Sequence, residues 1–118
     1  DLKERLAEAA LGQEFIAQAP LVVVACADHR IERRYGRRGK ELYALQDVAA
    51  SVQNLLLEAY ELGLGAVWVG AFHEEAVRAI LDLPGYLRPV TLIPIGLPDE
   101  EPLPPERLPR RLLIEVRR

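Results

Sequence analysis

The longest periodic segment of the chain constrains its fold most. Between Glu41 and Leu62, apolar residues recur at spacings of three and four, the repeat of one helix face. The middle of this segment, "VAASVQNLLLEA", is apolar or small on nearly every side. We therefore expect a long helix that is buried all round, either at the centre of a domain or in a subunit interface.

Three short apolar segments have the composition of buried strands. "LVVVACA" (21–27), "AVWVG" (66–70) and "PVTLIPIG" (89–96) are rich in β-branched residues and are bounded by turn-forming or polar residues. Pro94 lacks a backbone N–H, so it predicts a sheet edge or a bulge. "LLIEV" (112–116) is a fourth strand candidate.

The remaining segments predict short helices, a loop and an arm. Helical spacing begins after Asp1, which we expect to cap the first helix, and ends at Gly12. A second short helix is predicted over Glu74–Leu81. The polar, basic segment 28–40 reads as a loop, and the proline-rich segment 97–109 reads as a stiff extended arm. The order of elements alone fits an α/β or an α+β domain.

Composition excludes several classes of function. The 118 residues suffice for one domain, and the net charge of −3 gives no general attraction to nucleic acid. No apolar run is long enough to cross a bilayer. The single cysteine, Cys26, cannot form an internal disulfide, and with only two histidines it gives no ligand spacing typical of a zinc site. We expect a cytoplasmic protein without a metal, a nucleic-acid partner or a membrane partner.

The stretch "GLGAVWVGAFHEE" (63–75) raises the possibility of a phosphate loop. Its glycines do not have the spacing of a dinucleotide fingerprint, and a helix precedes them where a strand should. Gly63 or Gly65 is expected to end the long helix in a left-handed conformation. Gly70 ends a strand and is followed by Ala71, so it either forms a bend or places a ligand against bare backbone N–H groups.

These segments, in this order, closely resemble the FMN-dependent nitroreductase family. The resemblance extends from Leu2 to Val116 and is strongest in the long helix, in "GLGAVWVGAF" and in "PIGLP". It implies an α+β fold with a mixed β-sheet flanked by helices, a long central helix and an extended C-terminal arm. It further implies a homodimer with FMN at the subunit interface, and an arm that reaches over the partner subunit.

The resemblance also assigns site residues. It implies that the backbone amides of Gly70 and Ala71 face the flavin N5 and O4, and that Trp68 and Val69 line the ring. Arg107 matches the arm position that holds the FMN phosphate, with Arg110 as its rival. The flavin would pass hydride from NAD(P)H to nitro, quinone or related small-molecule acceptors, so no catalytic side chain is required.

One part of the family pattern is not found in this sequence. The resemblance implies an arginine-rich start that clamps the phosphate, followed by a Ser/Asn segment that contacts the flavin. We therefore expect residues 1–118 to form a single, N-terminally incomplete domain, with 97–118 as its arm. The alternative is a flavin-free binding or structural dimer on the same fold that has lost this phosphate clamp.

The basic segment "HRIERRYGRRGK" (29–40) has two interpretations. One is a solvated, mobile loop. The other is a lid that attracts an anionic substrate or the phosphate of a nicotinamide nucleotide.

Overall fold

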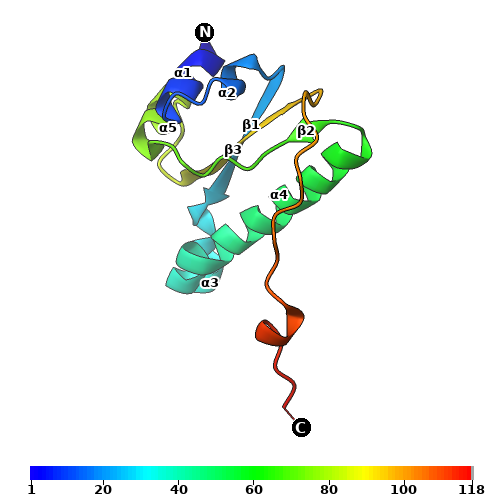
Figure 1. Cartoon of the computed structure of the whole chain (residues 1–118). Helices are drawn as coiled ribbons and strands as arrows, with labels where there is room; N and C mark the ends of the chain where they lie inside the picture. Colours follow the sequence, from blue (N-terminus) through cyan, green and yellow to red (C-terminus); the bar gives the residue numbers. More distant parts are fainter. Residues whose placement is uncertain (118) are drawn as a thin grey trace.

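A computed structural model describes residues 1–117 and contains a small sheet with helices on both faces (Figure 1). The strands are β1 (Leu21–Asp28), β2 (Gly65–Ala66) and β3 (Leu87–Gly96). Their order is β1-β3-β2, and β3 pairs antiparallel with both neighbours. The α+β class is confirmed, whereas the described strands form an antiparallel sheet in place of the expected mixed one.

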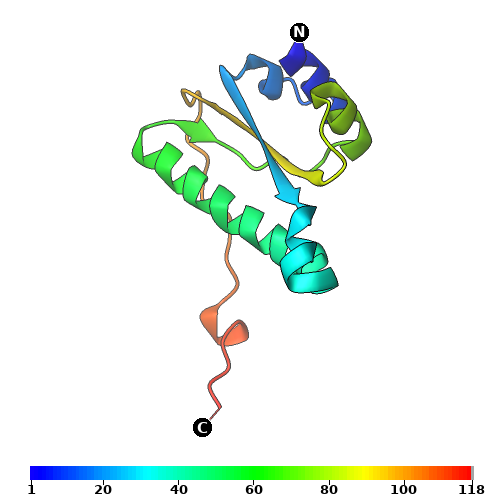
Figure 2. The same cartoon turned by 180° about the vertical axis from the view of Figure 1, so that it is seen from behind.

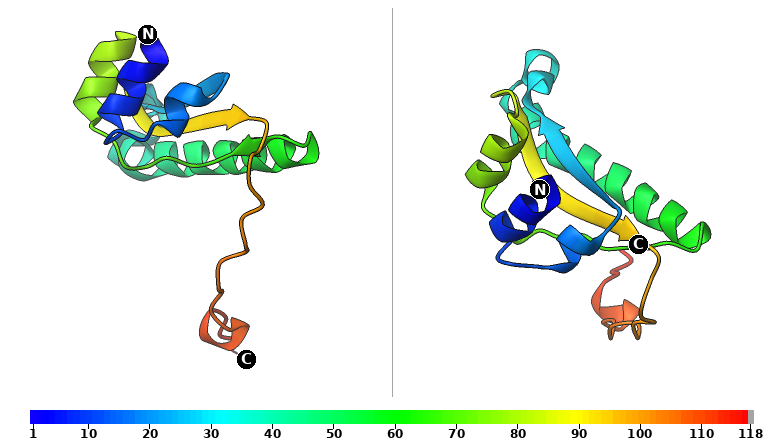
Figure 3. Two further views of the ribbon diagram at one scale, coloured as in Figure 1. Left: turned by 45° about the horizontal axis from the view of Figure 1, so that its top comes forward. Right: turned by 90° about the horizontal axis from the view of Figure 1, so that it is seen from above.

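The helices form two layers, one on each side of the sheet (Figure 3). They are α1 (Leu2–Ala9), α2 (Phe15–Gln18), α3 (Glu32–Arg38), α4 (Ala44–Glu61) and α5 (Glu74–Leu81). The helices α1, α2 and α5 share a core cluster that contains Leu92, while α4 packs in a second cluster that contains Ile93. Because successive strand residues point to opposite faces, Leu92 packs against the helices on one face of the sheet and Ile93 packs against α4 on the other.

The first helix has its predicted start and cap but ends at Ala9, before Gly12, and the last helix has its predicted bounds. The Asp1 side chain accepts a hydrogen bond from the Lys3 amide, and the Glu4 side chain bonds back to the Asp1 amino group. This capping box satisfies backbone donors at the start of α1. The α5 helix spans the predicted residues and has His73 as its N-cap residue.

The long helix ends as predicted but is buried on one face only. Gly63 has a φ of 74°, its N–H donates to Tyr60, and the N–H of Leu64 donates to Ala59. This is the Schellman arrangement that a left-handed glycine permits. Burial all round is not found in this chain, because Tyr60 is 83% exposed and the small residues at 49–51 face outward. The expectation rested on composition, which does not distinguish a core face from a face left open.

The basic segment predicted as a loop is helical. A 3₁₀ turn (His29–Ile31) leads into α3, and a π-helical turn (Gly39–Tyr43) joins α3 to α4. Ion pairs between Arg37 and Glu41, at 2.8 Å, and between Lys40 and Glu32, at 3.5 Å, stabilise these turns. Gly36, with a φ of 61°, forms a kink within α3. A glycine of this kind is also common in loops, which is consistent with the loop predicted for this segment.

The central strand contains Pro94, where an edge or a bulge was predicted. The irregularity in the register lies at Ala25/Cys26, away from Pro94, so both forms of the prediction were wrong. The N–H of Leu92 donates to the carbonyl of Val69. The backbone of Pro94, two residues later, faces the same side of β3. On that side Val67 stands opposite Pro94, between the pairs Ala66/Ile95 and Val69/Leu92. The N–H that Pro94 lacks therefore leaves a gap in the ladder between β2 and the Val69–Leu92 bridge.

Residues 97–117 form an extended arm that leaves the body of the molecule, as Figure 2 shows. A 3₁₀ turn (Arg110–Leu112) interrupts it, and the strand predicted at 112–116 is not formed. Among the described residues, no strand pairs with this segment. The last residue of the predicted arm, Arg118, lies outside the described residues. Among the described helices, none has the length and apolarity that a bilayer crossing requires.

Candidate functional site

The segment that contains Gly70 and Ala71 is fixed at both ends. Before it, Val69 and Leu92 exchange two backbone hydrogen bonds, of 2.9 and 3.1 Å. After it, the amide of His73 donates to the carbonyl of Ala9 at the end of α1, at 2.9 Å. The residues between these anchors are therefore held in place across the surface by the sheet on one side and by α1 on the other.

This segment presents backbone donors to solvent. Within residues 1–117, the amides of Gly70 and Ala71 have no hydrogen-bond acceptor, and both residues are exposed. The carbonyl of Ala71, in contrast, accepts from the Gln13 side chain at 3.2 Å. Two free N–H groups on a fixed backbone form a site for an acceptor atom, and their small side chains leave the approach open.

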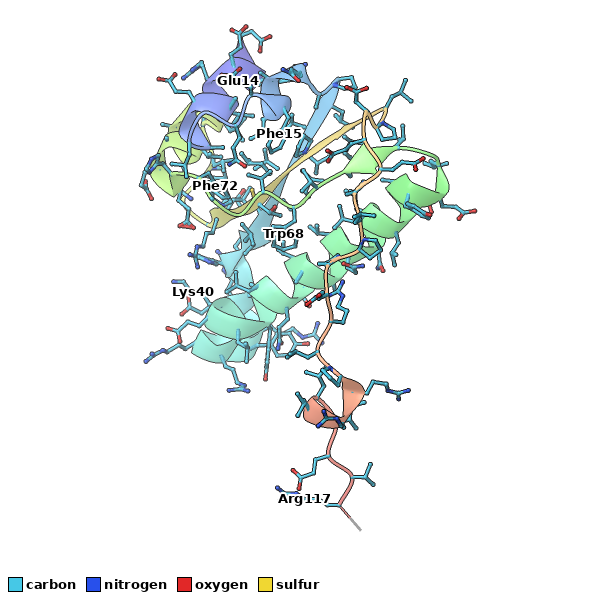
Figure 4. All side chains as sticks on the ribbon, in the orientation of Figure 1. Glu14, Phe15, Lys40, Trp68, Phe72 and Arg117 are labelled. Atoms are coloured by element: carbon cyan, nitrogen blue, oxygen red, sulfur yellow. The ribbon has the colours of Figure 1, made fainter. Side chains whose placement is uncertain are left out.

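The side chains of Trp68 and Val69 have different surroundings. Val69 is 4% exposed and packs in the cluster of α1 and α5, so its side chain belongs to the core. Trp68 is 39% exposed, and a Cβ placed on Gly70 would lie 3.3 Å from its Nε1. The indole therefore rests against the bare backbone of Gly70, and Figure 4 shows it displaced from Phe72 in the direction of α4.

A hollow of about 480 Å³ adjoins Gly70. Its walls are about equally polar and apolar, and the apolar residues include Leu45 from α4 and Phe72 from the segment itself. Its charged groups are Glu74 and Arg88, which form an ion pair at 2.6 Å. A hollow with both apolar and polar walls, next to the free amide of Gly70, suits a flat ligand that carries acceptor atoms along one edge.

Two residues of this site were not predicted from the sequence. Gln13 links α1 to the Gly70 segment, with its Nε2 2.8 Å from the Ala10 carbonyl and also bonded to the Ala71 carbonyl. Thr91 is fully buried, and its hydroxyl lies 3.0 Å from the Val69 carbonyl. Both contacts join residues far apart in the chain, so no local spacing could have indicated them.

Arg107 does not lie with the other predicted site residues. It is exposed on the arm, which Figures 1 and 2 show leading away from the sheet and from Gly70. The structure thus brings together Trp68, Val69, Gly70 and Ala71 but leaves Arg107 apart. Within one copy of the chain, the two parts of the predicted site do not meet.

Cys26 lines a separate hollow between β1 and α4, also of about 480 Å³. Burial raises the pKa of its thiol, with a smaller opposing effect of Arg78. The protonated thiol is therefore favoured at neutral pH, and the residue has the character of a small apolar side chain.

The comparisons with known proteins agree with this fold. The model of the Nitroreductase family matches residues 1–97, which is most of the chain. The chain belongs to the nitroreductase family. A protein of Methanocaldococcus jannaschii named as a nitroreductase is 43% identical over 97 residues, which cover 81% of this chain and 48% of that protein.

Two further comparisons show how much of its relatives' length this chain spans. A Thermus thermophilus protein named NADH dehydrogenase is 34% identical, with 91% of this chain and 66% of that protein covered. The solved structure of NfrA2 from B. megaterium superimposes with a TM-score of 0.86 at 28% identity, over 97% of this chain and 52% of that one. The chain thus spans about half to two thirds of the length of these relatives.

Proposed function

We propose that this nitroreductase-family chain forms part of an FMN-dependent NAD(P)H oxidoreductase. The observation that carries the proposal is the pair of free amides at Gly70 and Ala71, held in a fixed segment with a hollow beside Gly70. The names of the relatives support NADH or NADPH as the reductant, since they include an NADH dehydrogenase and an NADPH nitroreductase.

In this proposal the residues of the segment bind and orient the cofactor. The amides of Gly70 and Ala71 donate hydrogen bonds to the flavin N5 and O4, and Trp68 lies beside the ring. Val69 fixes the segment through its backbone bonds to Leu92. When bound, FMN supplies the hydride transfer from NAD(P)H to a nitro, quinone or related acceptor. The protein needs no acid–base side chain for this step, because it only positions the ring and leaves one face open.

The second part of the proposal is a homodimer. The arm exposes Leu103, Leu108, Leu112, Leu113, Ile114 and Val116, and the outer face of α4 exposes Leu57 and Tyr60. Apolar surface of this kind is buried when subunits associate. We propose that the arm lies over the partner subunit, where Arg107 reaches the phosphate of the FMN held beside the partner's Gly70 segment. Arginine suits this role because its planar guanidinium makes two-point contacts with phosphate.

The alternative is a flavin-free binding or structural dimer on the same fold. The isolation of Arg107 from the Gly70 segment within one chain favours it, since one copy holds only part of a cofactor site. The exposed apolar residues of the arm and of α4 would serve such a dimer equally well.

The visible absorption spectrum separates these two functions. The complete gene product that contains this chain is purified, its spectrum recorded, and FMN then added with NADH or NADPH. The oxidoreductase proposal requires flavin absorbance in the purified or reconstituted protein and bleaching of that absorbance by the nicotinamide nucleotide. A dimer that neither carries nor takes up FMN establishes the alternative.

A further inference from the structure

The basic turns after β1 form a third hollow, distinct from those beside Gly70 and Cys26. Residues 28–41 carry six cationic and three anionic side chains, a net charge of +3 in a chain whose net charge is −3. Since the remainder of the molecule is acidic, this concentration of positive charge attracts anions locally without making the whole protein basic. Residues 28–41 are therefore the part of the molecule where an anionic ligand is expected to bind.

The hollow has a volume of about 400 Å³ and brings together two distant segments. Its cationic residues are Arg30, Arg33 and Lys40, and Tyr86 with Gly85 closes it from the turn before β3. The amide of His29, which also lines it, donates to the Tyr86 carbonyl at 2.8 Å. This bond fixes the two walls relative to each other.

The cations of the hollow differ in their partners. Arg30 pairs with Asp28 at 2.6 Å, and its guanidinium stacks on the Tyr86 ring at 4.1 Å from the centroid. Lys40, labelled in Figure 4, lies 3.5 Å from Glu32, the one carboxylate that lines the hollow. Arg33 forms no ion pair within residues 1–117. The hollow therefore holds one uncompensated guanidinium beside two cations whose positions are already fixed.

We propose that this hollow binds the phosphate groups of the nicotinamide nucleotide, with Arg33 as the principal contact. The proposal rests on the proposed function for the identity of the nucleotide. Guanidinium and ammonium groups on a fixed scaffold are suited to phosphate oxygens, and Arg33 has no competing carboxylate.

The position of the hollow fits a dinucleotide that also reaches Gly70. Tyr86 lies two residues before Arg88, which lines the hollow beside Gly70. Tyr86 lies in the turn before β3, and its carbonyl accepts from His29 beside the Asp28/Leu87 pair, so both hollows adjoin the same end of β3. A ligand whose ring lies beside Gly70 and whose phosphates lie some distance from that ring can therefore occupy both hollows at once.

A titration with ADP tests this site without flavin or redox chemistry. The probe is ADP, with adenosine as the control that lacks phosphate, followed by NMR of the amides at low salt. The variant is Arg33→Glu, and the matched control is Arg34→Glu, which changes the net charge equally on the same helix but does not line the hollow. Arg34 likewise forms no ion pair within the described residues; it lies over the Tyr35 ring at 5.2 Å.

We expect ADP to shift the amides of His29 and Gly85 and to bind more tightly than adenosine. Loss of a charge-assisted contact weakens ADP binding by about tenfold in Arg33→Glu, whereas Arg34→Glu changes it by about twofold or less. No ADP binding, equal effects of the two variants, or binding of duplex DNA without ADP would overturn the proposal. ADP binding without flavin uptake would sink the oxidoreductase function alone, and flavin uptake without ADP binding would sink this site alone.

Discussion

Val69 and Leu92 each donate a backbone hydrogen bond to the other, at 2.9 and 3.1 Å, three residues beyond the end of β2. This isolated bridge is the last point at which the chain is fixed to the sheet before Gly70. The exposed amides of Gly70 and Ala71 therefore take their position from a buried pair in the core.

Thr91 supports this bridge, and its removal is expected to loosen it. The buried hydroxyl lies 3.0 Å from the Val69 carbonyl and 3.2 Å from the Leu92 carbonyl. Thr91→Val keeps the volume but loses the donor, so we expect a loss of about 1 kcal/mol in the free energy of unfolding. Urea denaturation measures it, with Thr91→Ser as the control that retains the hydroxyl. A valine variant as stable as the original chain would show that the hydroxyl contributes nothing.

Gly70→Ala is expected to weaken FMN binding without unfolding the protein. The new Cβ would lie 3.3 Å from Trp68 Nε1, so the indole must give way slightly, and the added methyl narrows the approach to the Gly70 amide that the cofactor needs. We expect the affinity for FMN to fall by about tenfold, the equivalent of one lost hydrogen bond. Gly85→Ala is the matched control, because a Cβ there meets nothing within 4 Å. Equal FMN affinities in the two variants, measured by fluorescence titration, would contradict this use of Gly70.

Truncation of the arm separates its two proposed roles. Deletion of residues 103–118 removes exposed apolar side chains and Arg107, so both the dimer and the FMN affinity should weaken. Arg107→Gln keeps the apolar residues and should weaken FMN binding alone. Sedimentation velocity and FMN titration measure the two effects. A truncated protein that remains fully dimeric would remove the arm from the interface.

The Arg30–Asp28 pair predicts a dependence on pH. The hydrogen bonds from Arg30 lower the pKa of Asp28 from 3.8 to about 2. Because the folded chain favours the ionised carboxylate, the stabilisation is present above the ordinary pKa and is lost as the pH falls toward 2. Arg30→Gln should return the pKa of Asp28 toward 3.8, as followed by NMR of the carboxyl carbon. An Asp28 that still titrates near pH 2 in the variant would show that another group holds its charge.

Local patterns predicted those elements whose signals lie within a few residues. The α5 helix has its predicted bounds, and Gly63 ends α4, because helix caps and glycine conformation are local properties. The α3 helix was missed because the polar composition and the glycines of this segment favoured a loop, although Arg37 and Glu41 have the i,i+4 spacing of a helical ion pair. The strand predicted at 112–116 was wrong for another reason, since an apolar segment forms a strand only where another strand lies beside it.

The candidate site also contains residues that the sequence indicated and residues that only the fold revealed. The sequence showed bare backbone after a strand at Gly70, and the resemblance to the family assigned Gly70 and Ala71 to the flavin, which stays a prediction. The clamp by Gln13, the support from Thr91 and the hollow shared by Arg33 and Tyr86 were not predicted, because each joins segments that only the folded sheet brings together.

The most direct test of the central claim is the response of two amides to FMN. The complete gene product, labelled with ¹⁵N, is titrated with FMN while the resonances of Gly70 and Ala71 are followed. We predict that both amide protons shift downfield as FMN binds, because each gains an acceptor, and that the amide of Val69, already bonded to Leu92, moves much less. FMN binding that leaves Gly70 and Ala71 unchanged, or no FMN binding at all, would contradict the account.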